Sequence, residues 1–226
     1  MKTDIPVLYE DNHLLVIVKP VNMPVQADDS RDPDVLTVMK DYLVKKYDKP
    51  GDAYLGLVQR LDRPVGGCMV LAKTSKAAAR LTASLQRHDL HKTYLAVTEG
   101  HPDAQGEWTD YLVKDGSTNT VRTTDAAHGK KAILTYRVAA TAGPLALAVV
   151  DLQTGRPHQI RVQFASRGYP LWGDQRYSHQ AVSGQQIALW SWKLTLEHPV
   201  SHQVLSFACL PPKRQPWDGF DLALLG

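Results

Sequence analysis

The sequence predicts an α+β fold with a mixed, largely antiparallel sheet and flanking helices. Segments with strand character outnumber the helical ones, and they mostly follow one another across short turns. Two or three segments with helical spacing are inserted between them. The chain has 226 residues, enough for one large domain or two small ones, and we expect residues 1–226 to form a single domain.

The N-terminal part of the chain predicts a hairpin followed by a helix. Val7–Tyr9 and His13–Lys19 are apolar segments separated by Asp11-Asn12, a pair typical of turns. A polar loop follows, and Asp34 is placed to cap the helix after it. The residues at helical spacing are Val35, Leu36, Met39, Tyr42, Leu43 and Tyr47.

The middle of the chain predicts three strands around a second helix. Tyr54–Val58 and Cys68–Lys73 are apolar segments on either side of a polar loop. Thr74 or Ser75 can cap a helix that carries apolar residues on one face. In Lys92–Glu99 the side chains alternate as in a strand, so Tyr94 and Ala96 face one way and Thr93 and Leu95 the other.

The C-terminal half predicts further strands and one short helix. The stretch Gly100–Gly129 is polar and Gly-rich, with strand character only around Trp108–Val113. The remaining expected elements are a hairpin of Lys131–Ala140 and Leu145–Gln153, a helix at His158–Ser166, and late strands at Ile187–Leu196 and Val204–Leu210.

Composition excludes several classes of protein. A hydrophobic share of 43% and a charged share of 22% are those of a globular protein rather than a disordered one. No apolar run approaches the ~20 residues of a membrane helix, and Met1–Pro6 lacks the apolar core of a signal peptide. Two cysteines form no secreted framework. We therefore expect a cytoplasmic protein without a membrane partner.

The cysteines and histidines predict no metal site. Cys68 and Cys209 match no ligand spacing, and His198 and His202 are separated by Pro199, which argues against one helical face. The net charge of +3 is compatible with a nucleic-acid partner but does not require one. We expect neither a metal nor another cofactor.

Three segments combine charge, glycine and tight turns beside apolar strands. In the first, Asp62 lies between Arg60 and Arg63, whose charges favour the ionised carboxylate. An aspartate at a turn is the other explanation of that pattern. In the second, Tyr94 can pack in the core or offer a platform for a nucleic-acid base.

The third segment, Asp151–Val162, ends a strand in Thr-Gly-Arg and begins a helix almost at once. Backbone amides at such a helix start suit phosphate. Arg156 and Arg161 can bind a phosphate or pair with a carboxylate. A helix start with solvated arginines explains the same residues, so both explanations stay open here.

Taken in order, these segments resemble the RluA family of RNA pseudouridine synthases. The family signature has H-R-L-D-R-x-T-S-G, K-x-Y-x-A-x-V-x-G, T-G-R-T-H-Q-I-R-V-H and G-x-P-x-x-G-D-x-x-Y, and His13–Pro20 is similar to its first strand. The matching stretches are Gln59–Gly67, Lys92–Gly100, Thr154–Gln163 and Gly168–Tyr177.

Some positions depart from the family pattern. Gln59 stands where the family has histidine, Val65-Gly66 where it has Thr-Ser, Pro157 where it has threonine, and Gln163 where it has histidine. None of these changes removes the aspartate, the tyrosine or the second arginine. They bear on the identity of the RNA rather than on the reaction type.

The resemblance implies a catalytic domain with a central RNA-binding cleft that isomerises uridine to pseudouridine without a cofactor. Asp62 takes the role of the essential carboxylate, either as a nucleophile at the sugar or as a base on the ribose. Arg161 matches the arginine that pairs with it, and Tyr94 the residue that stacks on the target base. Arg60 matches the residue that fills the gap left by the flipped base. The other residues assigned to RNA binding and base flipping are Arg63, Arg156, Gln159 and Ile160.

The implied partner is a structured RNA, either a ribosomal RNA or a transfer RNA stem-loop. We expect no obligate protein partner and no separate N-terminal RNA-binding domain. Two alternatives remain. One is the same fold binding RNA without catalysis, although Asp62, Tyr94 and Arg161 are all present. The other is a hydrolytic nucleosidase, which typically needs a second carboxylate.

Overall fold

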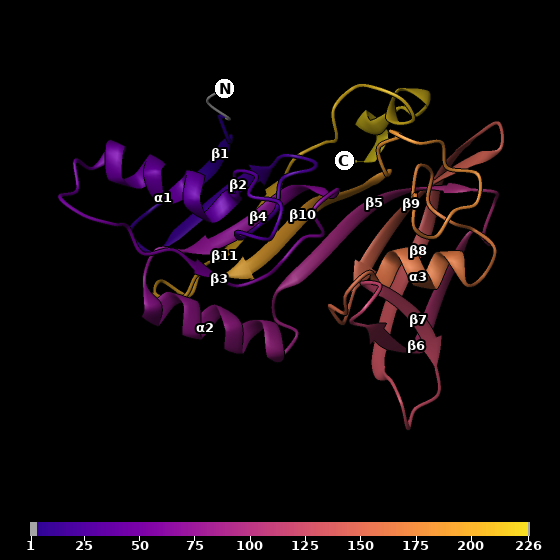
Figure 1. Ribbon diagram of the computed structural model, residues 1–226, viewed down its shortest axis with the longest axis horizontal. Coiled ribbons are helices and arrows are strands. Elements are labelled where there is room, and N and C mark those ends of the chain that lie inside the picture. Colours follow the sequence, from indigo (N-terminus) through magenta and orange to yellow (C-terminus); the bar gives the residue numbers. More distant parts are fainter. Residues whose placement is uncertain (1–3, 226) are drawn as a thin grey trace. The chain divides into compact units, whose positions relative to one another are not determined.

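The computed structural model describes residues 4–225 and divides into two compact units. Within the described residues, the first unit combines the chain up to Leu90 with Lys193–Cys209. The second combines His91–Trp192 with the chain from Leu210 onwards. Figure 1 shows the elements of both units along the chain. Antiparallel pairings join β1 to β4, β10 to β11, and β5 to β9 with their neighbours, and helices are inserted between strands, which confirms the predicted α+β class.

The first unit is a sheet in which β1, β2, β4 and β10 are successive neighbours, while β3 pairs with β4 and β11 with β10. β2 and β4 carry apolar side chains on both faces and are almost entirely buried, so both faces of this sheet need a cover. The strands are β1 (Val7–Glu10), β2 (Leu14–Lys19), β3 (Gly56–Leu57), β4 (Gly66–Ala72), β10 (Leu189–Glu197, from Lys193 in this unit) and β11 (Val204–Ala208).

Two helices supply that cover. α1 (Val35–Lys46) and α2 (Ser75–Gln86) lie on opposite sides of the strands in Figure 1. Leu81 of α2 belongs to the same buried cluster as alternate residues of β2 and β4. Both helices begin at a capped residue, because the side chains of Asp34 and Thr74 accept hydrogen bonds from backbone amides of the first turn. The sequence therefore predicted both helix starts.

The second unit is a sheet in the order β5-β9-β8-β6-β7. A short helix, α3 (Gln159–Ala165), packs on it through Val162 and Phe164. Val162 contacts a cluster of buried apolar residues, and Phe164 meets the rings of Trp108 and Tyr136 edge-on. The strands are β5 (His91–Glu99), β6 (Gln105–Asp115), β7 (Thr120–Thr124), β8 (Lys130–Ala142) and β9 (Leu145–Leu152). The chain after Leu210 adds the 3₁₀ turns η1 (Trp217–Gly219) and η2 (Leu222–Leu225).

The structure differs from the expectation in two strands. β7 was not predicted, because Val121 is its only apolar residue and leaves no alternating pattern to detect. β3 is limited to Gly56–Leu57, shorter than the predicted strand, and Tyr54 ahead of it is largely exposed. The other predicted strands and helices occur within a few residues of their expected bounds.

Candidate active site

The loop that carries Asp62 connects β3 to β4, and a buried lysine donates hydrogen bonds to its backbone carbonyls. Lys19, at the end of β2, has no solvent exposure. Its ammonium donates hydrogen bonds to the carbonyl oxygens of Pro20 (2.9 Å), Arg63 (3.0 Å) and Val65 (2.8 Å). Asp62 itself is half-buried. Lys19 therefore fixes two carbonyls that closely follow Asp62 in the chain.

Lys19 is an ionisable group in an apolar setting. Burial lowers the pKa of the Lys19 ammonium to about 7, the charge of Asp62 opposes that shift, and the charge of Arg63 adds to it. The motifs did not predict Lys19 as a residue of the site. The only signal was a lysine that closes an otherwise apolar strand directly before Pro20, and it is weak because a lysine at a strand end is usually solvated.

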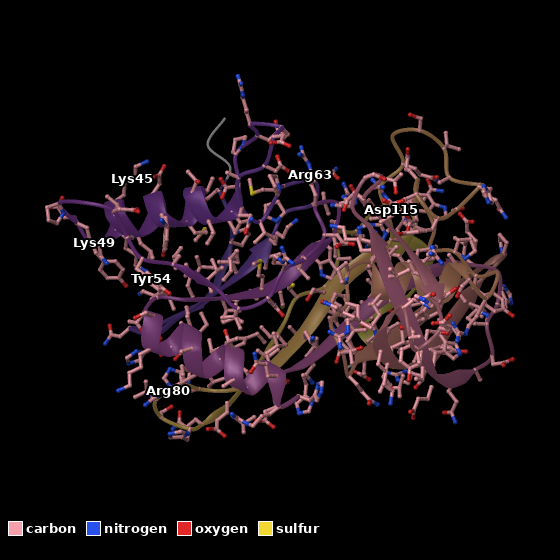
Figure 2. The ribbon with its side chains drawn as sticks, turned by 60° about the horizontal axis from the view of Figure 1, so that its bottom comes forward. Lys45, Lys49, Tyr54, Arg63, Arg80 and Asp115 are labelled. Atoms are coloured by element: carbon pink, nitrogen blue, oxygen red, sulfur yellow. The ribbon has the colours of Figure 1, made fainter. Side chains whose placement is uncertain are left out.

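Arg63 is bound by an acidic loop of the same unit. Its guanidinium forms ion pairs with Asp28 and Asp32 and donates a hydrogen bond to the hydroxyl of Ser30 (2.9 Å). Figure 2 labels Arg63 at the edge of the first unit. Hydrogen bonds from Ser30, and then the charge of Arg63, lower the pKa of Asp28. Arg60, two residues before Asp62, is exposed to solvent.

Gln59 opens the Asp62 loop and is buried. Its amide nitrogen lies 3.5 Å from the carbonyl oxygen of Cys68, and its side-chain oxygen has no hydrogen-bond partner among residues 4–225. Glutamine at this position therefore packs against the following strand with one polar atom unsatisfied.

In the second unit, Gln159 organises the loop between β9 and α3. Its side-chain oxygen accepts hydrogen bonds from the hydroxyl of Thr154 (2.8 Å) and the amide of Arg156 (3.0 Å). Its side-chain nitrogen donates to the carbonyl of Ile133 in β8 (3.0 Å). Gln159 is buried, so these bonds replace water that the side chain gave up. The Thr-Gly-Arg loop is thereby fixed on the sheet.

The side chains around the start of α3 have different environments. Arg156 is half-buried, and its Nε donates to the carbonyl of Lys131 (2.8 Å). His158, just before α3, adopts a left-handed backbone conformation with φ 50° and ψ 21°. Its Nδ1 lies 2.7 Å from the hydroxyl of Tyr177, which holds the imidazole in place. Ile160, in the first turn of the helix, is buried in the core.

Arg161 forms a two-bond ion pair with Asp174. The Nε donates to Oδ2 and the NH2 group to Oδ1, both at 2.8 Å. Only 6% of the arginine side chain and none of the aspartate side chain is exposed. The ring of Tyr177 lies beneath the guanidinium, 5.2 Å from it. The expected partner of Arg161, Asp62, belongs to the other unit, and that pairing stays a prediction.

The loop that supplies Asp174 and Tyr177 is tied to the rest of the second unit. The Tyr177 hydroxyl accepts a hydrogen bond from the amide of Val121 (2.8 Å), and burial raises the pKa of that phenol. Ser178 donates to the buried carboxylate of Glu99 (2.7 Å). Tyr94 lies in β5 opposite Val150 of β9 and is 7% exposed. This loop therefore holds the Asp174 carboxylate and the Tyr177 ring against Arg161.

Residues 13–166 match the sequence model of the RNA pseudouridylate synthase family. The chain belongs to this family. That match confirms the family predicted from the four motifs, together with the enzyme class. The family's chemistry is the isomerisation of uridine to pseudouridine in RNA.

Curated pseudouridine synthases extend the match over most of the chain. The ribosomal large subunit pseudouridine synthase D of Zymomonas mobilis is 31% identical over 224 residues, which are 93% of this chain and 71% of that protein. The protein of the same name from Salmonella typhimurium is 36% identical over 88% of this chain and 65% of its own length.

Solved structures of pseudouridylate synthase domains share the fold. Human RNA pseudouridylate synthase domain containing 4 aligns with a TM-score of 0.78 at 22% identity, covering 92% of this chain and 89% of that one. Human RNA pseudouridylate synthase domain containing 1 aligns with a TM-score of 0.74 at 19% identity, covering 96% and 86%.

Two residues that contact predicted site residues of this pseudouridine synthase were not themselves predicted as site residues. Asp174 and Tyr177 are the last two fixed letters of the fourth motif, G-x-P-x-x-G-D-x-x-Y, but the motif alone assigns them no task. Their role depends on contacts with Arg161 and His158, which precede them in the chain by more than a helical turn and across an irregular loop.

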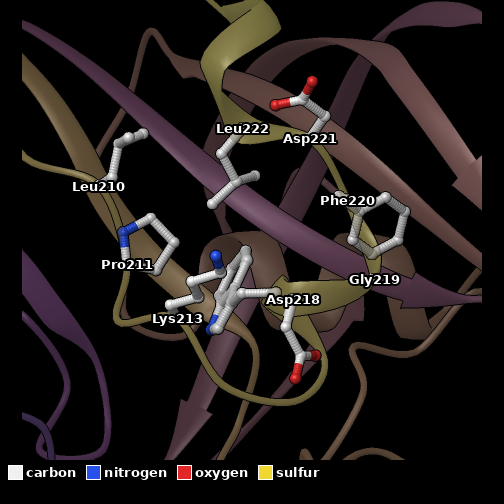
Figure 3. A pocket seen from close by; sticks show the side chains of 9 residues that line it. Leu210, Pro211, Lys213, Asp218, Gly219, Phe220, Asp221 and Leu222 are labelled. Carbon is white, nitrogen blue, oxygen red and sulfur yellow. The ribbon is translucent and has the colours of Figure 1, made fainter.

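A separate cavity lies in the C-terminal segment of the second unit. It has a volume of about 460 Å³, and Figure 3 shows Lys213, Asp218 and Phe220 among its lining residues. None of its lining residues belongs to the four motifs. Within residues 4–225, no group of His, Cys, Asp or Glu is arranged to hold a metal ion, and no helix is long and apolar enough to cross a membrane.

Proposed function

We propose that this pseudouridine synthase modifies a uridine in large-subunit ribosomal RNA, with Asp62 as its catalytic carboxylate. The observation that carries the proposal is the Asp62 loop. Its sequence matches the family's Arg-Leu-Asp-Arg motif, and its backbone is anchored by the fully buried Lys19. The ribosomal RNA is proposed from the names of two relatives that cover most of this chain. A transfer RNA stem-loop is the alternative target.

In the proposed reaction, the bond between uracil N1 and the ribose breaks and carbon 5 of the base bonds to the ribose in its place. Carbon 5 loses its proton and N1 gains one, so atoms and electrons balance without a cofactor. Asp62 acts in ionised form, either as the nucleophile or as the base. Arg161, always charged, holds Asp62 anionic, and Asp174 orients Arg161 through two of its nitrogen donors. Tyr94 stacks on the base.

The target uridine must leave its stack to reach these groups, and the RNA-binding residues serve that step. We propose that Arg60, which is exposed, enters the gap in the RNA, and that Arg63 and Arg156 contact phosphates. Gln159 acts indirectly in this proposal, because its side chain is already bonded to Thr154, Arg156 and Ile133. Ile160 is buried and shapes the loop from below.

We further propose that residues 1–226 work as one catalytic domain with a central RNA-binding cleft. The proposed setting is the cytoplasm, with RNA as the partner and no obligate protein partner. We propose no obligate protein partner because one polypeptide supplies the carboxylate, the arginine and the tyrosine.

Asp62→Asn tests the proposed function. The substitution keeps size and shape but removes the charge, so we expect RNA binding to persist while pseudouridine formation disappears. Pseudouridine is mapped by position in total RNA from cells with and without the gene, and in large-subunit ribosomal RNA treated with purified protein. Asp41→Asn, which removes an exposed carboxylate from α1, is the matched control and should retain full turnover.

Three outcomes contradict parts of the proposal. Substantial turnover by Asp62→Asn removes Asp62 from its role. Release of free uracil identifies hydrolysis instead of isomerisation. RNA binding by the unaltered protein without any pseudouridine identifies a binding protein of the same fold.

A further inference from the structure

Lys92 is a buried lysine whose charge the fold leaves uncompensated. It lies near the start of β5 and is only 8% exposed. Among residues 4–225, its ammonium has no hydrogen-bond acceptor and no ion pair. The nitrogen itself is not among the fully buried unpaired atoms, so the ammonium keeps contact with solvent at the end of a largely buried side chain. Burial lowers the pKa of Lys92.

The position of Lys92 places it beside the candidate catalytic residues of the second unit. Lys92 and Tyr94 are two residues apart in one strand, so both side chains lie on the same face of the sheet. The ammonium also reaches the Thr-Gly-Arg loop. A Cβ added to Gly155 would lie 3.1 Å from the Lys92 Nζ, so glycine leaves room for the ammonium against the loop backbone.

Three carboxylates of the second unit already accept hydrogen bonds from side chains other than Lys92. Asp151 in β9 is paired with Thr93, whose side chain lies on the opposite face from Lys92. Glu99, at the other end of β5, accepts a hydrogen bond from Ser178. Asp174 is occupied by Arg161 through both oxygens. None of these three carboxylates of the second unit is left to pair with Lys92.

We propose that Lys92 binds a backbone phosphate of the RNA beside the target uridine. This inference rests on the proposed function, because it takes the RNA to be the anion that arrives. A base stacked on Tyr94 brings its own flanking phosphates to the same face of β5. An ammonium is a compact charge that suits a phosphate oxygen in a narrow space, and the Gly155 loop provides such a space.

RNA binding is the first test. Lys92→Met keeps the aliphatic bulk and removes the charge. We expect its affinity for transcribed large-subunit ribosomal RNA to fall about ten- to a hundredfold, as for a charge-assisted contact. The slope of log affinity against log salt should become shallower by about one phosphate's worth, roughly 0.7–0.9. Lys114→Met, which removes an exposed lysine of β6, is the matched control and should change both quantities far less.

Thermal unfolding without RNA is the second test, and it distinguishes a ligand-binding lysine from a structural one. Removing a buried, unpaired charge relieves its desolvation, so Lys92→Met should melt several degrees higher than the unaltered protein. A lysine that holds the fold together predicts the opposite sign. Lys114→Met should melt within about a degree of the unaltered protein, as exposed substitutions usually do.

The third test locates the phosphate. In a short RNA containing the mapped uridine, each phosphate in turn is replaced by an uncharged methylphosphonate. We expect one replacement next to the uridine to weaken binding by the unaltered protein and to have no further effect on Lys92→Met. Replacements that act additively with Lys92→Met at every position overturn the assignment.

The outcomes separate this inference from the proposed function. If the unaltered protein forms no pseudouridine, the proposed function fails, while the melting and binding results still decide the role of Lys92. If pseudouridine forms but Lys92→Met binds RNA within about twofold of the unaltered protein, the phosphate site is wrong whatever the melting temperature does.

Discussion

Arg161 is held in one orientation by its surroundings. A guanidinium that donates two parallel hydrogen bonds to one carboxylate has little freedom to rotate, and the Tyr177 ring beneath it restricts it further. The remaining donors therefore point in a fixed direction. Because both side chains are almost fully removed from water, loss of either partner would leave the other charge buried and uncompensated.

Removing Arg161 should affect folding and catalysis separately. Arg161→Met leaves the buried Asp174 without its cation, and we expect the free energy of unfolding to fall by about 3–5 kcal/mol. In the double variant Arg161→Met/Asp174→Asn no charged carboxylate is left at this position, so much of that stability should return. Saturated single-turnover rates should stay orders of magnitude low in both variants, since each ~1.36 kcal/mol is tenfold in rate.

The matched control for Arg161 is the half-buried Arg156. Arg156→Met should weaken RNA binding and lower its salt dependence while leaving saturated turnover unchanged. Chemical denaturation, a salt series and single-turnover kinetics measure the three quantities. Normal saturated turnover by a folded Arg161→Met would show that Arg161 is a phosphate ligand instead.

For single residues, the sequence predicted residue types with a family role but not their contacts or their burial. The motifs identified Arg161 as a functional arginine, since a family pattern specifies residue types. They did not identify Asp174 as its partner or Lys92 as a buried cation, because both facts depend on what else is nearby after folding. Burial of Lys19 was equally hidden, since a strand-end lysine is usually solvated.

At the scale of elements, the loop between α3 and β10 positions the Arg161 partner through two glycines with positive φ. Gly168 has φ 83° and Gly173 has φ 72°, a region that other residues adopt with strain. They differ in their surroundings. A Cβ on Gly168 would meet nothing within 4 Å, whereas one on Gly173 would lie 2.6 Å from the carbonyl oxygen of Gln186.

The two glycines should therefore respond differently to alanine. Gly168→Ala carries the conformational cost alone, about 1–2 kcal/mol of unfolding free energy. Gly173→Ala adds a clash with backbone that cannot rotate away, so we expect at least about 2–4 kcal/mol. It should also slow turnover, because Asp174 follows directly. Equal costs in a denaturant titration would mean that the Gln186 backbone yields without penalty.

Elements were predicted where their signals are local. The caps of α1 and α2 come from Asp34 and Thr74, each next to its own helix. The hairpin of β8 and β9 follows from apolar runs around one turn. β7 depends on pairing with β6, and its threonines and single valine carry no periodic pattern, so only the folded chain reveals it.

At the scale of the whole molecule, Lys19 makes stability depend on pH. Its pKa is about 7 in the folded protein, against an ordinary value of 10.5 for a solvated lysine, so between those values the unfolded chain binds more protons than the folded one. Stability then rises with pH across that window. The sign follows from burial disfavouring the charged form.

Comparison with Lys19→Met isolates this effect. We expect the free energy of unfolding of the unaltered protein, relative to the variant, to increase from about pH 7 to about pH 10, with the steepest change inside that range. Urea titrations at a series of pH values measure it. A difference that stays flat or declines would mean that the three carbonyl acceptors keep Lys19 charged throughout.

The first unit is built from two separate parts of the chain, so its strands are not all synthesised together. β4 is synthesised long before its neighbour β10, because the whole stretch His91–Trp192 lies between Ala72 and Lys193. The second unit's strands β5 to β9 are contiguous and emerge complete while β4 still has an open edge. On the ribosome, we therefore expect the sheet of β5 to β9 to fold before the sheet of the first unit is complete. The edge of β4 stays exposed until Lys193–Cys209 has been synthesised.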